Sequence, residues 1–525
     1  MKNIRLFSII LLLAAFTACS EDALEMSPTT AVSGTSMFDN ATAALVPLNG
    51  IYCAMHKTGW TTSGDRPHNW AVRADMLAAD LMGDDMVIFT RSSGYFWRDH
   101  AYTMKERWTN TGSRSYVTWY GYYTYIANAN YIIAAENTMD GEKADINYVI
   151  GQAYAIRGYS YFQLARWFSR TYKGHESDPC VPLYTEPSVA GTQGKPRETV
   201  ENIYKQIVAD LDKAITLLNP EGGNCYTHTH ITHLDYYSVN GLRAQVALEM
   251  NDWAKAQSCA HIARSNTKIG EGTDLTDGMN KTTYKNVMWG MINTIDVIHY
   301  QRMLAAHMDQ GHGYTTAYGA RDPKYVTPWL YSKMGEKDVR RAWWTQVSNN
   351  NTKSRIEGGI GYWQDKFRYQ DPTTYTGDYI FMRNEEMLLI EAEALCRQKK
   401  DSEARALLLE LMAKRDPDYT CTKTGDSLGA LTTTLTGSLL EEILIQKRIE
   451  LWAEGERIFE IKRLKQGFER LSSQGFEART ISSVIPMSLS NPESYAWVMP
   501  IPQTEFDGNT SLNLEKDQNP LGDGL

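Results

Sequence analysis

"YSVNGLRAQVALEMNDWAKAQSCAHIAR", residues 237–264, predicts two helices joined by a short turn. Leu242, Val246 and Met250 recur every four residues and form one apolar stripe. Asn251 and the residue after it interrupt the pattern, and Trp253 begins a second helical segment. A single helix hairpin cannot bury a core by itself, so it must stack against further hairpins. The stretch therefore predicts a scaffold built from repeated helix pairs.

A second stretch, "RNEEMLLIEAEALCRQKKDSEARALLLELMAKR" (383–415), repeats this plan. Small residues recur where paired helices would cross closely, at Ala247 and Ala256 in one hairpin and at Ala394 and Ala404 in the other. We therefore expect an all-α fold of stacked tetratricopeptide-like helix hairpins, with a large loop-rich portion that binds ligand. Further helices are predicted at 113–137, 146–168, 199–218 and 438–465, the last two capped by Thr199 and Ser438.

Length alone would suggest roughly three or four domains, but the sequence offers no linker to separate them and favours one large body. The chain has 525 residues, of which 42% are hydrophobic and 22% charged, and its Gly- and Pro-containing stretches are too short to separate domains. Periodicity is lost between residues 265 and 380, where Gly, Asn, Asp and aromatic residues accumulate. Long irregular stretches inside compact proteins usually carry function. We expect a single body over 19–525, with a helical scaffold at about 40–260 and 380–470, a loop-rich insertion at about 265–380 and a C-terminal segment at about 471–525.

The N-terminus, "LFSIILLLAAFTACSED" (6–22), has the pattern of an export signal. Its apolar run follows Lys2 and Arg5 and is too short to span a bilayer. Phe16-Thr17-Ala18-Cys19 resembles the lipobox of bacterial lipoproteins, which predicts a signal peptide over 1–18 and lipidation of Cys19. The following acidic residues resemble the tag that directs Bacteroidetes lipoproteins to the outer face of the outer membrane. The alternative is an ordinary signal peptide with an incidental cysteine.

Charge and cysteine content exclude several functional classes. The formal net charge is −9, and no Lys/Arg-rich stretch offers a basic face, so nucleic acid is not an expected partner. Apart from Cys19, the cysteines are scattered and none forms a CxxC pair, which disfavours zinc and redox sites. Cys259 and Cys396 lie in helical patterns and are predicted to be small buried residues. We expect no cofactor and no metal.

The histidine tract "THTHITH" contains His228, His230 and His233. Three histidines this close could bind a metal, but no acid stands at helical spacing beside them and no H-E-x-x-H pattern is present. We interpret the tract as a solvated loop that enters the next helix.

Segments spread in order along the chain resemble the RagB/SusD family of outer-membrane nutrient-binding lipoproteins. They include "AYAIRGYSYFQLARWFSRTYKG" with "PCVPLYTEP", "PRETVENIYKQIVADLDKAITLL", "GLRAQVALEMNDWAKA", "RNEEMLLIEAEAL", "EEILIQKRIELWAEGERIFEIKR" and "VMPIPQTEFDGNTSLNLEKDQNP". Gln446, Lys447 and Glu460 depart from the residues usual in the family. The shared motifs belong mostly to the scaffold, so we interpret Arg157, Glu450, Glu454 and Arg457 as helix-to-helix ion pairs rather than catalytic groups. The resemblance covers essentially the mature chain.

This resemblance implies a SusD-like cell-surface lipoprotein that captures oligosaccharide or polysaccharide and delivers it to a SusC-like TonB-dependent outer-membrane transporter. In such proteins the ligand face comes partly from the N-terminal region and partly from loops in the middle of the chain. Aromatic rings suit sugar C–H faces, and the chain has 31 Tyr and 14 Trp but only 13 Phe. The candidate ligand-binding residues are Asp84, Asp85, Arg91, Tyr95, Trp97, Tyr300, Tyr314, Tyr318 and Trp329.

Two alternatives remain open at the level of sequence. A peptide- or protein-binding receptor of the RagB type would use the same scaffold. A glycoside hydrolase would need two carboxylates at a fixed separation, which sequence cannot place, and no nucleophile or metal motif supports an enzyme. The sugar itself stays open: Arg91, Arg98 and Arg321 could meet an acidic sugar, but acids lie in the same segments, directly after Arg98 and Arg321.

Overall fold

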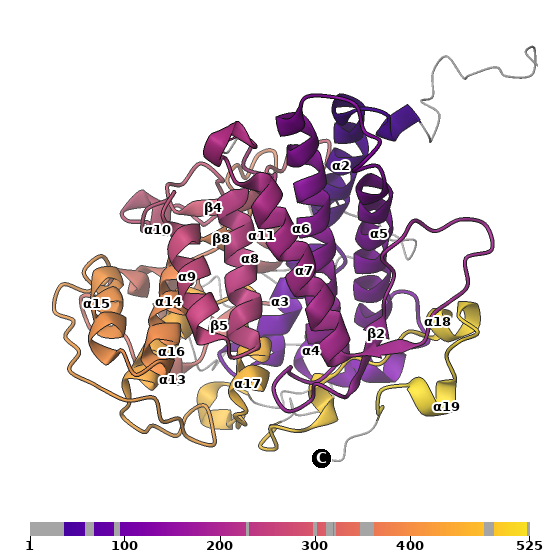
Figure 1. The fold of residues 1–525 in the computed structure, drawn as a ribbon. Coiled ribbons are helices and arrows are strands. Elements are labelled where there is room, and N and C mark those ends of the chain that lie inside the picture. The colour runs from indigo at the N-terminus through magenta and orange to yellow at the C-terminus, as the bar shows by residue number, and fades with distance from the viewer. Residues whose placement is uncertain are drawn as a thin grey trace, which may run out of the picture.

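The computed structural model describes residues 36–57, 68–88, 95–226, 230–297, 302–310, 319, 322–346, 362–476 and 488–521. The predicted signal peptide and Cys19 lie outside these residues. Helices dominate the described part, as the sequence predicts, and three small antiparallel sheets accompany them. Figure 1 shows the long helices standing side by side across the molecule, from α2 (Ala41–His56) and α5 (Arg114–Ala134) at one end to α15 (Asp401–Met412) at the other.

Neighbouring helices form antiparallel pairs that pack in succession. The predicted helix at 113–137 is observed as α5, the one at 146–168 as the longer α6, and the one at 199–218 as α7. Thr199 caps α7 by accepting a hydrogen bond from the Asn202 backbone N–H at 3.2 Å, as predicted. The first helices are α2 (Ala41–His56), α3 (Val72–Met82), α5 (Arg114–Ala134), α6 (Lys143–Phe168) and α7 (Val200–Leu218).

The hairpin that decides the fold is present as α8 (Tyr236–Glu249) and α9 (Trp253–Arg264). Asn251 adopts a left-handed φ of 60° in the turn, and Asp252 caps α9. The second hairpin is α14 (Asn384–Arg397) with α15 (Asp401–Met412). The small residues predicted at the crossings, Ala247 and Ala256 among them, are fully buried. Because these side chains are small, the paired helices can approach each other closely.

The predicted continuous helix over 438–465 is wrong in one respect. The structure divides it into α16 (Leu439–Glu450), capped by Ser438, and α17 (Arg457–Leu464). Ala453 and Gly455 between them have φ values of 65° and 99°, which a right-handed helix does not allow. Asp80 of α3 accepts the backbone N–H groups of Gly455 at 2.9 Å and Arg457 at 3.0 Å. A distant carboxylate therefore replaces the helical hydrogen bonds that local sequence favours.

Short elements fill the stretch between α9 and α14 and join it to the N-terminal region. One four-stranded sheet has the order β1-β5-β7-β6, and β4 pairs with β8. Two further strands, β2 and β3, lie between α6 and α7 in the sequence. The strands are β1 (Met86–Ile88), β2 (Pro179–Pro182), β3 (Arg197–Thr199), β4 (Val287–Met291), β5 (Lys324–Val326), β6 (Trp344–Gln346), β7 (Tyr362–Gln364) and β8 (Tyr379–Arg383).

The remaining elements are short. The C-terminal segment is tied to β3, because Arg197 hydrogen-bonds the Asn519 side chain at 2.9 Å, and it lies beside β2 in Figure 1. The short helices are α4 (Trp97–His100), α10 (Thr273–Thr276), α11 (Leu304–Met308), α13 (Pro328–Tyr331), α18 (Gln503–Gly508) and α19 (Leu514–Asp517), and the 3-10 turn η3 spans Thr103–Arg107.

The charged motif residues form buried ion pairs between elements, as predicted. Arg157 of α6 binds Asp210 of α7 at 2.6 Å. Glu450 binds Arg415 at 2.8 Å and Arg383 at 2.9 Å, and Arg383 also reaches Glu454 at 2.7 Å. Removing one member would leave the other charge buried without compensation, which is strongly destabilising. These residues belong to the scaffold.

The described cysteines are structural. Cys259 and Cys396 are buried, as predicted, and all six described cysteines are free thiols. His230 is exposed, whereas the ring nitrogens of His233 contact Tyr148 and Asn49, and His228 lies outside the described residues. No group of three or more His, Cys, Asp or Glu side chains suited to a metal occurs in the described part of the chain.

Candidate functional site

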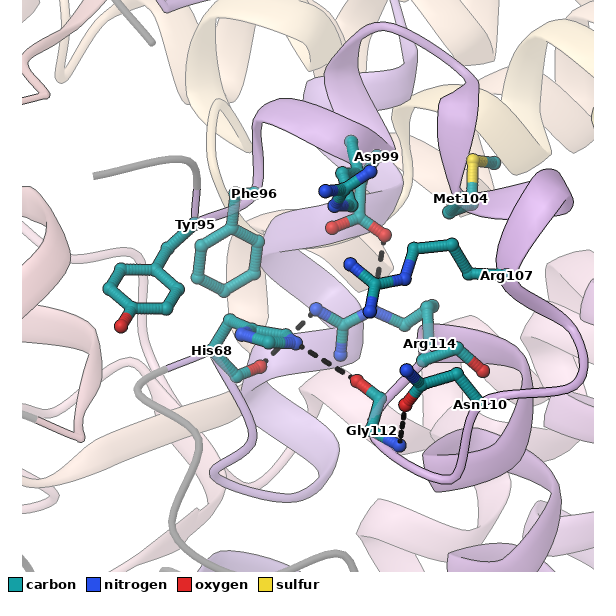
Figure 2. A pocket seen from close by; sticks show the side chains of 11 residues that line it. His68, Tyr95, Phe96, Asp99, Met104, Arg107, Asn110, Gly112 and Arg114 are labelled. Carbon is teal, nitrogen blue, oxygen red and sulfur yellow. Dashed lines mark hydrogen bonds and ion pairs between the residues drawn. The ribbon is translucent and has the colours of Figure 1, made fainter. Parts of the chain in front are cut away.

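A pocket of about 210 Å³ lies where the segment around His68, the short helix α4, the turn η3 and the first turn of α5 meet. Figure 2 shows Tyr95 and Phe96 on one side of it, Arg107 on the other, and Asp99 and Arg114 between them. The described residues that line the pocket all fall within 68–114, so the pocket is built from one part of the chain.

The backbone at this pocket is held in unusual conformations. Ala71, Phe96 and Tyr102 have φ values of 61°, 60° and 60°, although none of them is glycine. Such strain persists only where surrounding packing enforces it, and it is common at binding sites. The Tyr102 hydroxyl donates to the Met82 carbonyl at 2.6 Å, and Phe96 meets the His307 ring edge-on at 5.1 Å. These contacts fix where α4 begins and ends.

An aromatic cluster forms one wall of the pocket. The rings of His68 and Tyr95 stack with centroids 5.7 Å apart and an interplanar angle of 27°. Phe96 meets His68 edge-on at 6.3 Å and is buried, whereas Tyr95 is half-buried. Part of the Tyr95 ring therefore remains accessible at the pocket, on a support that limits its movement.

Arg114 organises the polar floor. It donates from Nη1 to Asp75 at 2.8 Å, from Nε to Asp99 at 3.2 Å and from Nη2 to the His68 carbonyl at 3.3 Å. Burial alone would lower the pKa of Arg114, but Asp99 and Asp75 raise it above its ordinary value. Burial also raises the pKa of Asp75 to about 6, against the opposing effect of Arg114. Arg114 is thus charged, and its guanidinium is already bound to two carboxylates and one backbone carbonyl.

Two more guanidinium groups line the pocket, those of Arg98 and Arg107, and both residues are half-buried. Asn110 and Gly112 form the opposite rim, where the Gly112 backbone N–H donates to the Asn110 side chain at 2.7 Å. Ser113 caps α5, so the pocket also meets the first turn of a 21-residue helix. The lining thus combines an aromatic face with cationic and amide groups.

The predicted site residues separate into groups. Tyr95 lies at the pocket, whereas Trp97 is buried and only 7% exposed. Asp84 and Asp85 are buried in ion pairs with Arg448 and Arg457. Trp329 is half-buried elsewhere, on α13. Arg91, Tyr300, Tyr314 and Tyr318 lie outside the described residues.

Sequence reasoning missed several pocket residues, chiefly His68, Arg107, Asn110 and Arg114. The stretch 98–114 carried one usable signal, since it contains three arginines that line the pocket and ends at a helix cap. Arginine in a helix-rich protein usually serves in ion pairs, so the pattern alone did not distinguish Arg107 from Arg114.

Comparison with protein families decides the classification. The SusD family model matches residues 191–521. The chain belongs to the SusD family. A second model, described as "Starch-binding associating with outer membrane", matches residues 69–240 and therefore includes the pocket-lining residues from Tyr95 to Arg114 of this SusD-family protein. The family is associated with the outer membrane. Among the described residues, no helix is both long enough and apolar enough to cross a bilayer.

Relatives and solved structures agree with this classification. A SusD-like protein, P2, of Formosa agariphila is 25% identical over 98% of this chain and 99% of its own length. A SusD-like carbohydrate binding protein from Bacteroides vulgatus has a TM-score of 0.73 at 23% identity, over 90% of this chain and 98% of its own. A laminarin binding SusD-like protein has a TM-score of 0.60 at 18% identity, over 92% of this chain and 100% of its own. The predicted helical SusD-like fold is confirmed.

Proposed function

We propose that this protein is a cell-surface glycan-binding lipoprotein that captures oligosaccharide or polysaccharide at the pocket beside α4 and delivers it to a SusC-like TonB-dependent transporter. The observation that carries the proposal is the half-buried Tyr95 ring, stacked on His68 at the edge of a polar cavity. Sugar rings bind to such sites through C–H contacts with an aromatic face and hydrogen bonds to neighbouring polar groups.

The size of the pocket suits part of a glycan. Its volume of about 210 Å³ is below the range typical for sites that enclose drug-sized ligands. A single sugar unit of a longer chain would enter it while neighbouring units extend over the surface. Membership of the SusD family supports this class of ligand, as does similarity in fold to a SusD-like carbohydrate binding protein and to a laminarin binding SusD-like protein.

The pocket favours capture over cleavage. Among the described residues that line it, Asp99 is the one carboxylate, and it accepts a hydrogen bond from Arg114. Glycosidases place two carboxyl groups on either side of the scissile bond, one to protonate the leaving group and one to act as base or nucleophile. Stacking and hydrogen bonds that are equal in the ground and transition states give affinity without accelerating a reaction.

Anchoring follows from the N-terminal motif. Lipidation of Cys19 would hold the protein at the outer membrane, facing the exterior, and several acyl chains are needed because one chain binds only marginally. The test is cell fractionation of Cys19→Ser, which should release the protein or leave it unprocessed. Normal processing with intact membrane partition would contradict the anchor.

The binding test uses a panel of plant and mucosal glycans together with peptides, measured by calorimetry. Tyr95→Ala should weaken binding of the best glycan by about 2- to 12-fold, the equivalent of one aromatic contact. Tyr131→Ala is the matched control, since Tyr131 is a 38% exposed tyrosine near the far end of α5, about 26 Å along that helix from Arg114. Binding of peptides alone would favour the RagB type of receptor, and equal affinity of the Tyr95 variant would remove the pocket from the proposal.

Delivery to a transporter is tested by co-expression with a SusC-like TonB-dependent transporter from the same genome. Stable co-purification of the two proteins is the expected result. Glycan uptake by cells should require both. Uptake that is unaffected by deletion of this protein would contradict a role in delivery.

A further inference from the structure

On the basis of the proposed function, we infer that the captured glycan carries an anionic substituent, a carboxylate or a sulfate ester, and that Arg107 pairs with it. Arg107 lies at the end of η3 and lines the pocket opposite Tyr95 (Figure 2). A sugar unit stacked on Tyr95 would present its substituents across the cavity toward this guanidinium.

Arg107 differs from the neighbouring cationic residues, Lys105 and Arg114, because their charged groups are already bound within the protein. Lys105, on the same turn, donates to the backbone carbonyls of Tyr495 at 2.7 Å and Pro520 at 2.8 Å. Arg114 is held by two carboxylates. Within the part of the chain that the structure describes, Arg107 has no ion pair and no side-chain hydrogen bond, although it is half-buried. Its guanidinium is therefore available to a ligand.

Arg107 forms no described ion pair with the carboxylates at the pocket, which are bound by Arg114. Asp99 lines the same pocket but accepts from Arg114, and Asp75 lies behind Arg114 and binds it as well. Arg98 adds a second guanidinium to the lining. The first turn of α5 forms another part of the wall, and the start of a helix carries positive partial charge. The electrostatic environment around Arg107 thus favours a negative group.

Burial by the ligand explains why a neutral sugar would be the weaker partner. When a glycan covers the pocket, it removes water from Arg107, and a desolvated cation without a counter-charge is costly. Sugar hydroxyls would supply hydrogen bonds but no opposite charge. A carboxylate or sulfate supplies both, and its oxygens match the planar fork of a guanidinium.

The test compares three oligosaccharides of equal length by calorimetry: an oligogalacturonate, its carboxyl-reduced neutral counterpart and a sulfated galactan fragment. We expect the carboxylated or the sulfated probe to bind about tenfold or more tightly than the neutral one, as one charge-assisted contact implies. This preference should shrink as salt is raised. The two charged arms distinguish a carboxylate site from a sulfate site.

Arg107→Gln should abolish the preference for the charged probe, together with the salt dependence of that preference, mainly by weakening binding of the charged probe. Arg405→Gln is the matched control, because Arg405 is also half-buried, forms no described ion pair and lies on α15, at the other end of the molecule in Figure 1. If the glutamine variant fails to fold, Arg107→Lys, which keeps the charge but loses the planar fork, should retain part of the preference and its salt dependence.

Equal affinity for all three probes, or a charge preference that survives in Arg107→Gln, would overturn the inference while glycan capture itself stood. Failure of every glycan in the panel to bind would overturn glycan capture and the inference with it. A charge preference that is lost equally in Arg405→Gln would show that net charge, and not Arg107, sets the preference.

Discussion

The guanidinium of Arg448 on α16 donates two hydrogen bonds to the carboxylate of Asp85, from Nε to Oδ2 at 2.9 Å and from Nη2 to Oδ1 at 2.6 Å. Both side chains are buried, and 363 residues separate them in the chain. Arg457 of α17 donates a single hydrogen bond from Nε to Asp84 Oδ1 at 2.7 Å. Burial would raise the pKa of Asp84, but Arg457 and Arg448 outweigh it and keep that pKa below its ordinary range. These pairs join the end of α3 to the C-terminal helices.

Replacing Asp85 by Ala should lower the free energy of unfolding by about 3–5 kcal/mol, because the buried Arg448 would lose both of its hydrogen bonds to Asp85 and keep only a longer ion pair with Asp84, at 3.3 Å. Urea unfolding followed by circular dichroism measures this change. Glu201→Ala, which removes an exposed pair with Lys205, is the control and should change stability by about 0.5 kcal/mol or less. A stable Asp85→Ala protein that loses glycan binding would show that Asp85 contacts the ligand instead.

His100 should make the protein less stable in acid. It is fully buried, its Nδ1 contacts the Leu81 carbonyl at 3.0 Å, and Nε2 has no described partner. Burial, reinforced by the charge of Arg470, lowers the pKa of His100 well below its ordinary value. Below about pH 6.5 the unfolded chain therefore binds a proton that the folded protein excludes, and stability falls by up to about 1.4 kcal/mol per pH unit.

The measurement for His100 is the unfolding free energy of the native protein relative to His100→Asn between pH 7 and pH 5. Asn keeps a donor for the Leu81 carbonyl but does not titrate in this range. The native protein should lose stability relative to the variant as pH falls. A difference that stays constant across the range would rule out titration of His100 as the cause.

Trp329 should act in stability rather than in binding. Arg448 and Lys333 lie over its ring at 4.5 and 4.6 Å from the centroid, so cations already cover it. Trp329→Ala should cost about 1–3 kcal/mol of stability through two lost cation–π contacts and leave glycan affinity unchanged once corrected for the folded fraction. Trp97→Ala, at a core position, is expected to behave likewise. Reduced affinity in a fully folded Trp329 variant would identify the ring as a glycan platform.

The purified protein should bind its glycan and leave it uncut, with a dissociation constant on the order of micromolar to millimolar. A receptor that passes cargo to a transporter must release it, so very tight binding would oppose its role. Chromatography of the oligosaccharide after long incubation measures cleavage. Product in excess of the protein, lost in Asp99→Asn, would show that the pocket is catalytic.

Helix pairing could be predicted well because its determinants are local. The apolar stripe through Leu242, Val246 and Met250 and the caps at Thr199 and Ser438 depend on residues within one or two turns. The break between α16 and α17 could not be predicted, since it depends on Asp80, which is more than 370 residues away from Gly455 in the chain. Periodicity carries no information about such a partner.

The candidate site shows the same division. Sequence selected Tyr95 as a ligand-binding residue, because a Gly- and Ser-containing segment with several aromatics is typical of a binding loop, and the structure places Tyr95 at the pocket. It grouped Asp84 and Asp85 with Tyr95 because all three lie close along the chain. In the fold, both aspartates instead form buried ion pairs with Arg448 and Arg457. Composition alone does not distinguish such an aspartate from one that binds ligand.

The sequence by itself determined the helical class, the order of the hairpins and the family resemblance, since each of these depends on short-range patterns of residue type. Only the tertiary structure decided which charges are used within the scaffold and which remain for a ligand. Arg107 and Arg114 lie seven residues apart and are chemically identical, yet Arg114 meets Asp75 and Asp99 while Arg107 meets no described carboxylate. The physical reason is that pairing depends on distances of a few ångströms between side chains, which packing sets after the helices have formed.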